Sequence, residues 1–265
     1  MPAPVSAQIC TLNEAANIVE CLKAVMANSP EDIVVIDGGS EDNTVELARQ
    51  SGVRVLEVGR IGLAGQRRAG YLTSTSEYTA FIDADDRIAP TWLATMVEEF
   101  EHGGYSALQS CLRVPQSDNW WESSWNQYFM ETIRPTTLTT MVGRPALYRT
   151  SDLMATSNSG DLLMEDTGMS RDFEIRGLKQ GIGTAVAFRT CPSTRSENFA
   201  KWQSYGRGYR QFVLTHPERR SSILKHIFVT IPFARTWRPV LRGHVSQPAF
   251  GLMSSFNIAR GYFSG

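Results

Sequence analysis

The first hundred residues alternate short apolar runs with segments of helical character, and this alternation limits the folds open to the chain. Runs at residues 5–12, 32–36, 54–58 and 78–82 predict strands, and Asn13 is expected to cap the first of the helices between them. Strands separated by single helices form parallel sheets with right-handed crossovers. Strands that are apolar along their whole length are buried on both faces. We therefore expect an α/β protein with a mostly parallel sheet flanked by helices.

The later part of the chain follows the alternation less regularly. Strands are predicted at residues 105–114, 146–149 and 183–189, and helices at 119–130 and 167–180. From residue 197 onward the sequence is basic, aromatic and mainly helical in character. The expected architecture is thus an α/β body followed by a helical C-terminal extension.

Charge is distributed unevenly between these two parts. Residues 1–194 hold 15 Lys and Arg against 25 Asp and Glu, whereas residues 195–265 hold 11 against 2. Such asymmetry predicts contact between the basic region and an anionic surface. A basic face that packs on the acidic body is the alternative. Nucleic acid is not expected as a partner, because no recognised binding module is present and the acidic body would repel a duplex.

The composition of the basic region favours a membrane over other anionic surfaces. Residues 201–210 interleave Trp202, Tyr205 and Tyr209 with Lys and Arg. Aromatic rings lie at headgroup depth in a bilayer, and cations contact the anionic phosphates there. No stretch reaches the apolar length of a membrane span, and residues 1–4 lack the pattern of a signal peptide. Four cysteines without CxxC spacing favour a reducing compartment over a zinc site or disulfides.

Three carboxylates follow the predicted strand at residues 78–82, in the sequence Asp83-Ala84-Asp85-Asp86. Carboxylates are almost never buried without partners, so these acids should face a crevice. A divalent cation with a phosphorylated ligand would satisfy them, because hard cations take oxygen ligands from carboxylates and phosphates together. A solvated acidic turn before the next helix is the alternative interpretation.

Polar residues at the ends of two other predicted strands strengthen the cation hypothesis. Residues 11–14 (Thr-Leu-Asn-Glu) follow the first strand, and Asp37 follows the second. In open α/β sheets, ligands bind at the carboxyl ends of the strands. Asp37 could accept hydrogen bonds from a nucleoside, or simply form the turn that Gly38 and Gly39 favour. Arg67 could pair with a diphosphate, whereas Arg68 is expected to be surface charge.

These motifs, in this order and spacing, resemble those of the family 2 glycosyltransferases. The resemblance covers residues 5–100 through Thr11-Leu12-Asn13-Glu14, residues 35–44, Gly65-Gln66-Arg67 and residues 81–86. Further on, Glu165-Asp166 follows a flexible loop at residues 157–160 and resembles the acidic pair of the family's acceptor site. The resemblance implies the GT-A fold and a nucleotide-diphosphate-sugar donor. The first turn lacks the glycines that a dinucleotide needs, which excludes a dehydrogenase.

The resemblance also implies a role for each site residue. Asp85 would hold Mn²⁺ or Mg²⁺, and Asp83 would bind ribose or reach the metal directly or through water. Asp166 would be the general base, with Glu165 as its competitor. The acids could instead be placed there by the helix dipole alone. Asp86 and Trp125 are predicted on the acceptor side. The implied donor-binding residues are Thr11, Leu12, Asn13, Glu14, Asp37, Gly38, Arg67, Asp83, Ala84 and Asp85.

The implied activity is a metal-dependent, inverting sugar transfer, with a UDP-sugar favoured as donor and a glycan or a polyprenyl- or other lipid-linked acceptor. Residues 1–194 would form the catalytic domain, with donor binding in 1–104 and acceptor binding in 105–194. Residues 195–265 would associate with the inner face of a membrane from the cytoplasm. A retaining glycosyltransferase or a nucleotidyltransferase remains an alternative enzyme. The non-enzyme alternative is a nucleotide-sugar-binding protein that docks on membranes.

Overall fold

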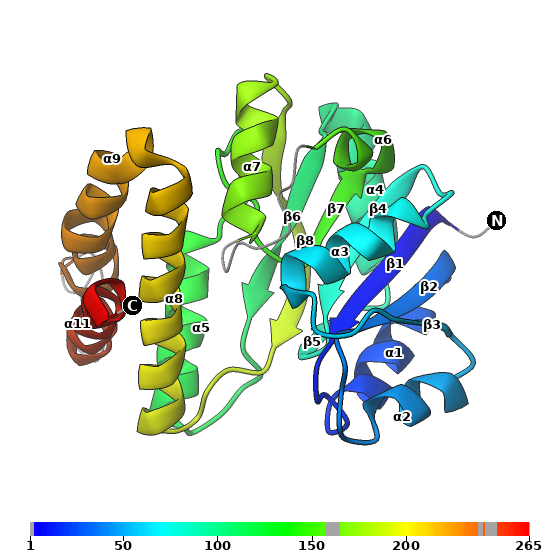
Figure 1. Ribbon diagram of the computed structural model, residues 1–265, viewed down its shortest axis with the longest axis horizontal. Helices are drawn as coiled ribbons and strands as arrows, with labels where there is room; N and C mark the ends of the chain where they lie inside the picture. Colours follow the sequence, from blue (N-terminus) through cyan, green and yellow to red (C-terminus); the bar gives the residue numbers. More distant parts are fainter. Residues whose placement is uncertain (1–2, 157–164, 238–240, 242–247, 265) are drawn as a thin grey trace. The chain divides into compact units, whose positions relative to one another are not determined.

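An eight-stranded mixed sheet forms the centre of the first of two structural units (Figure 1). The computed structural model describes residues 3–156, 165–237, 241 and 248–264. The sheet order is β3-β2-β1-β4-β7-β6-β8-β5. Its strands are β1 (Ala3–Thr11), β2 (Pro30–Asp37), β3 (Arg54–Glu57), β4 (Tyr78–Asp83), β5 (Asp86–Ile88), β6 (Ala107–Arg113), β7 (Ala146–Arg149) and β8 (Gln180–Arg189).

The strands of the N-terminal half are parallel, as the alternation of strands and helices predicts. β1 pairs with β2 on one side and with β4 on the other, and β2 pairs with β3. In this register Thr11 lies opposite Asp37, and Cys10 lies opposite Asp83. Beyond β4 the sheet becomes mixed, because β7 runs antiparallel to both β4 and β6. The parallel half therefore brings the carboxyl ends of β1, β2 and β4 to one edge.

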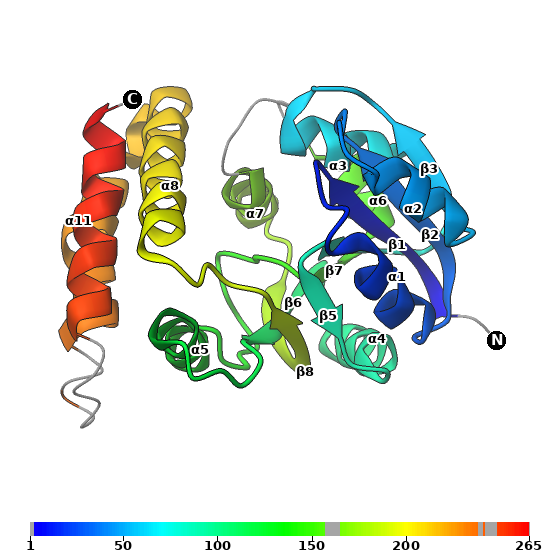
Figure 2. The same ribbon diagram turned by 90° about the horizontal axis from the view of Figure 1, so that it is seen from below.

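Helices cover both faces of the sheet, with α3 and α6 on one face and α1 and α4 on the other (Figure 2). Buried side chains of α3, α6 and α7 share a core with β4 and β7, which includes Tyr71, Phe81, Tyr148, Leu153 and Phe173. The helices of this unit are α1 (Ile18–Met26), α2 (Thr44–Gln50), α3 (Gly62–Leu72), α4 (Trp92–Gly103), α6 (Thr150–Met154) and α7 (Glu165–Ile175).

The predicted cap of the first helix is wrong. Asn13 has a φ of 58°, a left-handed conformation that Asn tolerates better than most residues, and α1 begins only at Ile18. The Asn13 side chain instead connects the loop after β1 to the loop after β2, because its Oδ1 accepts a hydrogen bond from Glu41 N–H at 2.8 Å. The loop predicted at residues 157–160 lies outside the described residues.

Of the described residues, the second unit comprises 114–132, 191–237, 241 and 248–264, and the predicted helical character of the C-terminal region is confirmed. Thr194 and Glu197 form a capping box at the start of α8, a pattern that satisfies two free backbone N–H groups. Its helices are α5 (Trp120–Thr132), α8 (Arg195–Thr215), η1 (Pro217–Arg219), α9 (Arg220–Lys225), η2 (His226–Thr230), η3 (Phe233–Trp237) and α11 (Pro248–Ser264).

Close helix packing and aromatic contacts hold this second unit together. A Cβ atom on Gly206 of α8 would lie 2.1 Å from the carbonyl oxygen of Ile258 in α11, and one on Gly261 would lie 2.1 Å from the carbonyl oxygen of Gln203. Glycine at both positions therefore allows the two backbones to touch.

Among the described residues, no helix is long and apolar enough to span a bilayer.

Candidate active site

A pocket of about 500 Å³ lies at the carboxyl ends of β1, β2 and β4. Of the predicted donor-binding residues, the structure brings seven to its wall: Thr11, Leu12, Glu14, Gly38, Asp83, Ala84 and Asp85. Cys10, Arg60, Gly62, Leu63 and Gln66 complete the lining. Asn13, Asp37 and Arg67 do not line the pocket. The convergence of three strand ends on one edge is thus observed, with a somewhat different set of side chains facing the cavity.

Gln66 joins the strand ends that form the pocket. The sequence analysis did not predict this role. Its buried Nε2 donates to the carbonyl oxygens of Thr11 and Ile36, both at 2.9 Å. A Cβ atom on Gly38 would lie 2.8 Å from this amide nitrogen. A side chain at residue 38 would therefore displace Gln66, which explains the glycine at this point of the pocket wall.

Asp37 forms the turn after β2. Its carboxylate accepts hydrogen bonds from Thr11 Oγ1 at 3.0 Å and from the backbone N–H groups of Gly39 and Ser40, both at 2.9 Å. Burial alone would raise the pKa of Asp37, but these bonds and that from the Ser40 hydroxyl together lower it. The turn that was the alternative interpretation of Asp37 is present, so any contact of this residue with a nucleoside remains a prediction.

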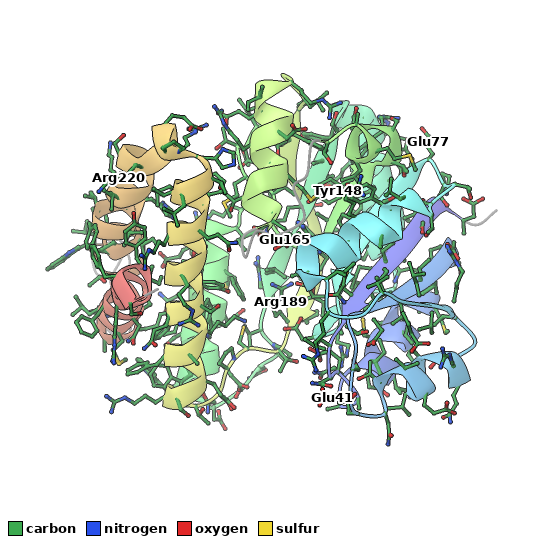
Figure 3. The ribbon with its side chains drawn as sticks, in the orientation of Figure 1. Glu41, Glu77, Tyr148, Glu165, Arg189 and Arg220 are labelled. Carbon is green, nitrogen blue, oxygen red and sulfur yellow. The ribbon has the colours of Figure 1, made fainter. Side chains whose placement is uncertain are left out.

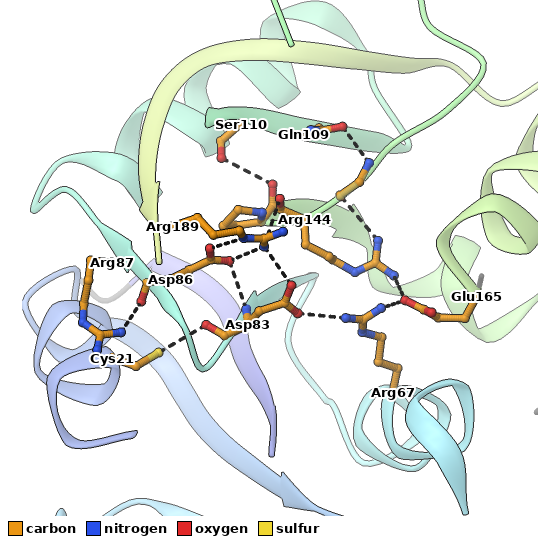
Figure 4. Close-up of polar contacts among 12 residues, drawn as sticks. Cys21, Arg67, Asp83, Asp86, Arg87, Gln109, Ser110, Arg144, Glu165 and Arg189 are labelled. Carbon is orange, nitrogen blue, oxygen red and sulfur yellow. Dashed lines mark hydrogen bonds and ion pairs between the residues drawn. The ribbon is translucent and has the colours of Figure 1, made fainter. Parts of the chain in front are cut away.

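The acidic motif at the end of β4 divides into an unpaired carboxylate, that of Asp85, and two paired ones, those of Asp83 and Asp86, whose contacts Figure 4 shows. Ligand atoms of Asp83, Asp85 and Asp86 lie within 4.8 Å of one another. Asp83 Oδ1 accepts from Arg67 and Asp83 Oδ2 accepts from Arg189, each at 2.8 Å. The Asp85 carboxylate makes no hydrogen bond or ion pair with any described residue. Of the three acids, Asp85 is therefore the one whose oxygens are open to a cation.

Asp86 is fully buried and binds Arg189 with both oxygens. Arg189 Nε donates to Asp86 Oδ1 at 2.7 Å, and its terminal nitrogen donates to Asp86 Oδ2 at 2.8 Å. This pairing follows from the sheet, in which Asp86 of β5 lies directly opposite Arg189 of β8. The predicted acceptor-side role of Asp86 does not fit a side chain with no exposed surface. Asp86 instead fixes the position of Arg189.

Asp83, Asp86 and Glu165 form an ion-pair network with Arg67, Arg144 and Arg189. Burial and the arginines act in opposite directions on the pKa values of its acids. Burial would raise the pKa of Asp83, but Arg189, Arg67 and Arg144 lower it below its ordinary value. For Asp86 burial dominates and raises the pKa to about 7, although Arg189 opposes this change. The neighbouring carboxylates outweigh burial at Arg189 and hold its pKa well above the ordinary value. Asp83 therefore remains an anion held between two guanidinium groups.

Arg67 lies in this network and not against the pocket. Arg67 shares the inward face of α3 with Ala64 and Tyr71 and is 2% exposed, whereas Arg68 is exposed, as expected for surface charge. Besides Asp83, its guanidinium pairs with Glu165 at the start of α7. In this arrangement Arg67 joins two carboxylates, and its contact with a diphosphate stays a prediction.

Glu165 and Asp166, the predicted acidic pair, have different surroundings. Glu165 is buried and also pairs with Arg144, whose nitrogen lies 3.5 Å from Glu165 Oε1 (Figures 3 and 4). Asp166 is half-buried and forms no ion pair within the described residues; its Oδ1 accepts from the Thr167 N–H at 2.7 Å. The carboxylate of Asp166 is thus the less constrained of the two.

Trp125, predicted on the acceptor side, belongs to the core of the second unit. Its ring is 2% exposed and packs against Trp202 and Phe250 at centroid distances of 6.2 and 5.3 Å. Its indole N–H donates to Asn198 Oδ1 at 2.7 Å. Burial of the ring and of its polar atom explains why Trp125 is present, and we assign it a packing role in place of the predicted acceptor contact.

Sequence reasoning missed three arginines of the site. Arg189 ends a predicted strand, but only its register with β5 places it against Asp86. Arg144 lies between the helix predicted at 119–130 and the strand predicted at 146–149, and it donates to the Tyr148 hydroxyl at 2.9 Å. Arg60 lines the pocket and pairs with Glu41. Arg189 could have been identified by its position, because it is the last residue of a strand. The acids were identified by the same position at the carboxyl ends of their strands.

A mixed sheet of this order, with a pocket at the carboxyl ends of its parallel half, defines an α/β domain of the GT-A class. The chain belongs to glycosyl transferase family 2, whose model matches residues 6–156. The predicted fold and family are both confirmed.

Individual relatives resemble about a third of the chain. An uncharacterized glycosyltransferase of Escherichia coli, YibD, is 34% identical over 95 residues, which are 34% of this chain and 26% of that protein. Glycosyltransferase AglE of Haloferax volcanii is 34% identical over 99 residues, or 34% of this chain and 33% of its own length. The matched segments thus span about a third of these relatives or less.

Solved structures share the fold at low identity. The mannosyltransferase PcManGT of Pyrobaculum calidifontis, in complex with GDP-Man and Mn²⁺, has a TM-score of 0.68 and 17% identity. That alignment covers 100% of this chain and 78% of the other. S. aureus TarS 1–349, in complex with UDP-GlcNAc, has a TM-score of 0.58 and 14% identity, over 80% of this chain and 67% of the other.

Proposed function

We propose that this protein transfers a sugar from a nucleotide-diphosphate sugar to an acceptor hydroxyl group. The observation that carries the proposal is the unpaired carboxylate of Asp85 in a pocket of about 500 Å³ at the strand ends. A pocket of this size suits a nucleotide sugar. The family relationship and the nucleotide sugars bound by structural neighbours support the same ligand class. UDP is favoured as the nucleotide, with GDP as the second candidate.

Asp85 would hold Mn²⁺ or Mg²⁺, and the donor set fits such a hard cation, because its carboxylate oxygens are free while the neighbouring acids are already paired. When bound, the metal would stabilise the negative charge that develops on the departing diphosphate. Asp83 would accept a hydrogen bond from ribose or from a metal-bound water through its remaining lone pairs. Arg60, on the pocket wall, would contact the diphosphate.

Asp166 would act as the general base. It would take the proton of the acceptor hydroxyl as the oxygen attacks the anomeric carbon from the face opposite the leaving diphosphate, which inverts the configuration. A base needs an available carboxylate, and that of Glu165 is committed to Arg67 and Arg144. Glu165 would therefore keep these cations in position, whereas Asp166 would move the proton.

The acceptor is proposed to be linked to a polyprenyl or other lipid, and the protein to bind the inner face of a membrane from the cytoplasm. Support comes from the basic residues of the C-terminal region and from the exposed aromatic side chains among them. Phe256 and Phe263 of α11 are 68% and 69% exposed, and Trp237 of η3 is 59% exposed. Aromatic rings with neighbouring cations suit the interface of an anionic bilayer.

A screen of nucleotide sugars tests this function. Purified protein is incubated with UDP- and GDP-sugars and Mn²⁺, with and without a polyprenyl phosphate acceptor, and release of UDP or GDP is measured. We expect release with one donor class, metal dependence, and stimulation by the acceptor. Determination of the anomeric configuration of the product distinguishes inversion from retention. Release of a sugar 1-phosphate, with the nucleoside monophosphate transferred to the acceptor, in place of a nucleoside diphosphate would indicate a nucleotidyltransferase and contradict the proposal.

A further inference from the structure

A second pocket, of about 430 Å³, lies within the helical unit and has no part in the chemistry described above. Helices α8 and α11 form it together with the turn at Pro217 and the start of α9. Two arginines lie in its wall, Arg210 from α8 and Arg220 at the start of α9, where Figure 3 labels it. Apolar and aromatic side chains form the rest: Val213, Leu214, Pro217, Tyr262 and Phe263.

The two arginines have no counter-charge within the described residues. Neither forms an ion pair or a hydrogen bond there, in contrast to Arg67 and Arg189, which are held by carboxylates. Glu218, the acid between them in sequence, lies 3.6 Å from His216. Two neighbouring guanidinium groups without an acid repel each other, so an anion from outside would relieve an unfavourable arrangement.

The apolar part of the pocket narrows the class of anion. Leu214 is 73% exposed and Phe263 is 69% exposed, so both present hydrocarbon surface to the outside beside the arginines. On α11 the exposed side chains Leu252, Phe256 and Phe263 follow one another at spacings of 4 and 7 residues, and so form one stripe along the helix. A free phosphate or an acidic peptide would leave this surface in water, whereas a lipid would cover it.

We propose that Arg210 and Arg220 bind the phosphate of an anionic membrane lipid, whose hydrocarbon chain lies along Leu214 and Phe263. Guanidinium groups bind phosphate oxygens through paired, charge-assisted hydrogen bonds. The apolar side chains enter the interface beside the headgroup. This site rests on the proposed function, because a transferase with a lipid-linked acceptor has to work at the bilayer surface. Arg210 and Arg220 would then hold the helical unit on that surface.

Vesicle flotation with the full chain tests the lipid site. Vesicles of phosphatidylcholine with 20% phosphatidic acid are compared with phosphatidylcholine alone, in the absence of donor. The variant R210Q/R220Q is compared with R207Q/R260Q, which removes the same charge from exposed positions of α8 and α11 that do not line the pocket. We expect the first pair to weaken binding about tenfold more than the second, because charge-assisted hydrogen bonds add to diffuse attraction. Equal losses would overturn the proposal.

A second variant pair tests the apolar part independently of charge. Leu214→Ser is compared with Leu138→Ser, since the two leucines are 73% and 72% exposed and only Leu214 lines the pocket. Weaker flotation of the first alone supports the site, and equal flotation of the two contradicts it. Displacement of the protein from vesicles by millimolar inorganic phosphate or by polyglutamate would indicate a soluble anion or an acidic peptide in place of a lipid, and would overturn the proposal.

The lipid site and the proposed function can fail separately. UDP binding with Mn²⁺ is measured on the same variants and should match the wild type, because the substituted residues lie outside the donor pocket. Loss of flotation with intact UDP binding supports the lipid site. A wild type that floats on anionic vesicles but releases no nucleotide from any donor contradicts the transferase proposal and leaves the lipid site supported.

Discussion

The donor pocket and the ion-pair network beside it use the same residue types in opposite ways. In the network Asp83, Asp86 and Glu165 are held by Arg67, Arg144 and Arg189. At the pocket wall, Asp85 has no partner among the described residues, although it lies between Asp83 and Asp86 in the sequence. Neighbouring carboxylates of one motif thus differ completely in what they can bind.

This difference shows which acids are structural and which are available for chemistry. A buried carboxylate without a cation would cost several kcal/mol, so the network arginines are needed for folding. Because they pair with Asp83 and Asp86, the carboxylate of Asp85 is the one in this motif that remains available to a metal.

Asp166→Asn should give the largest effect on activity. Loss of a general base lowers kcat by about 10²- to 10⁴-fold, while donor binding stays within about twofold, because the amide keeps the shape of the side chain. Turnover and UDP binding are measured in parallel. Glu165→Gln is the contrast: it removes the anion that pairs with Arg144 and one of the two that pair with Arg67, and it should lower the thermal stability. Undiminished turnover in Asp166→Asn would show that this residue is not the base.

Arg189→Met should destabilise the first unit by about 3–5 kcal/mol, because it leaves Asp86 buried with no cation. The control is Arg49→Met, which removes an arginine that pairs with Glu57 where both side chains are more than half exposed; it should cost less than about 1 kcal/mol. Urea denaturation of both variants measures the difference. If the two variants unfold at the same urea concentration, the network is not structural.

These comparisons also show how far the sequence could predict the structure. The acids at the ends of β1, β2 and β4 were predicted at one edge because parallel strands end on the same side. The buried position of Arg67 could not be predicted from its local sequence, because the carboxylates that pair with it, Asp83 and Glu165, come from other elements of the fold. Once α3 is a helix, its spacing to Ala64 and Tyr71 turns Arg67 inward.

The remaining misses depend on long-range pairing. Arg189 meets Asp86 only through the antiparallel register of β5 and β8, and β5 is three residues long, too short to give a periodic signal. The packing of Trp125 could not be predicted, because its partners Trp202 and Phe250 lie more than seventy residues further along the chain. Local patterns carry no information about such contacts.

Gln66→Leu should destabilise the first unit by about 1–3 kcal/mol, because it leaves the carbonyl oxygens of Thr11 and Ile36 without their donor. It should also weaken UDP binding, since those strand ends form the pocket. Gln50→Leu is the control, because Gln50 is exposed and bonds only to Glu46 on its own helix. Denaturation and UDP titration measure both effects, and equal behaviour of the two variants would contradict the role of Gln66.

The smallest effect is expected from the pH dependence of Asp37. Its pKa is lowered in the folded state, so its charged form stabilises the fold above the ordinary carboxyl pKa of about 3.9, and this contribution is lost as pH falls through the lower folded value. The Tm difference between wild type and Asp37→Asn should therefore be constant near pH 6 and shrink below about pH 4. A Tm difference between the two proteins that grows as the pH falls would contradict the claim that Asp37 is a hydrogen-bonded anion in the folded state.

Metal-dependent nucleotide binding by Asp85→Asn tests the central claim most directly. UDP is titrated into wild type, Asp85→Asn and the surface control Glu98→Gln by calorimetry, with Mn²⁺ and with EDTA. Wild type and the control should bind UDP at least about tenfold more tightly with Mn²⁺ than with EDTA, and Asp85→Asn should lose this difference because the free carboxylate is gone. If Asp85→Asn keeps the full Mn²⁺ dependence, Asp85 is not the metal ligand, and the division between paired and available acids does not describe this site.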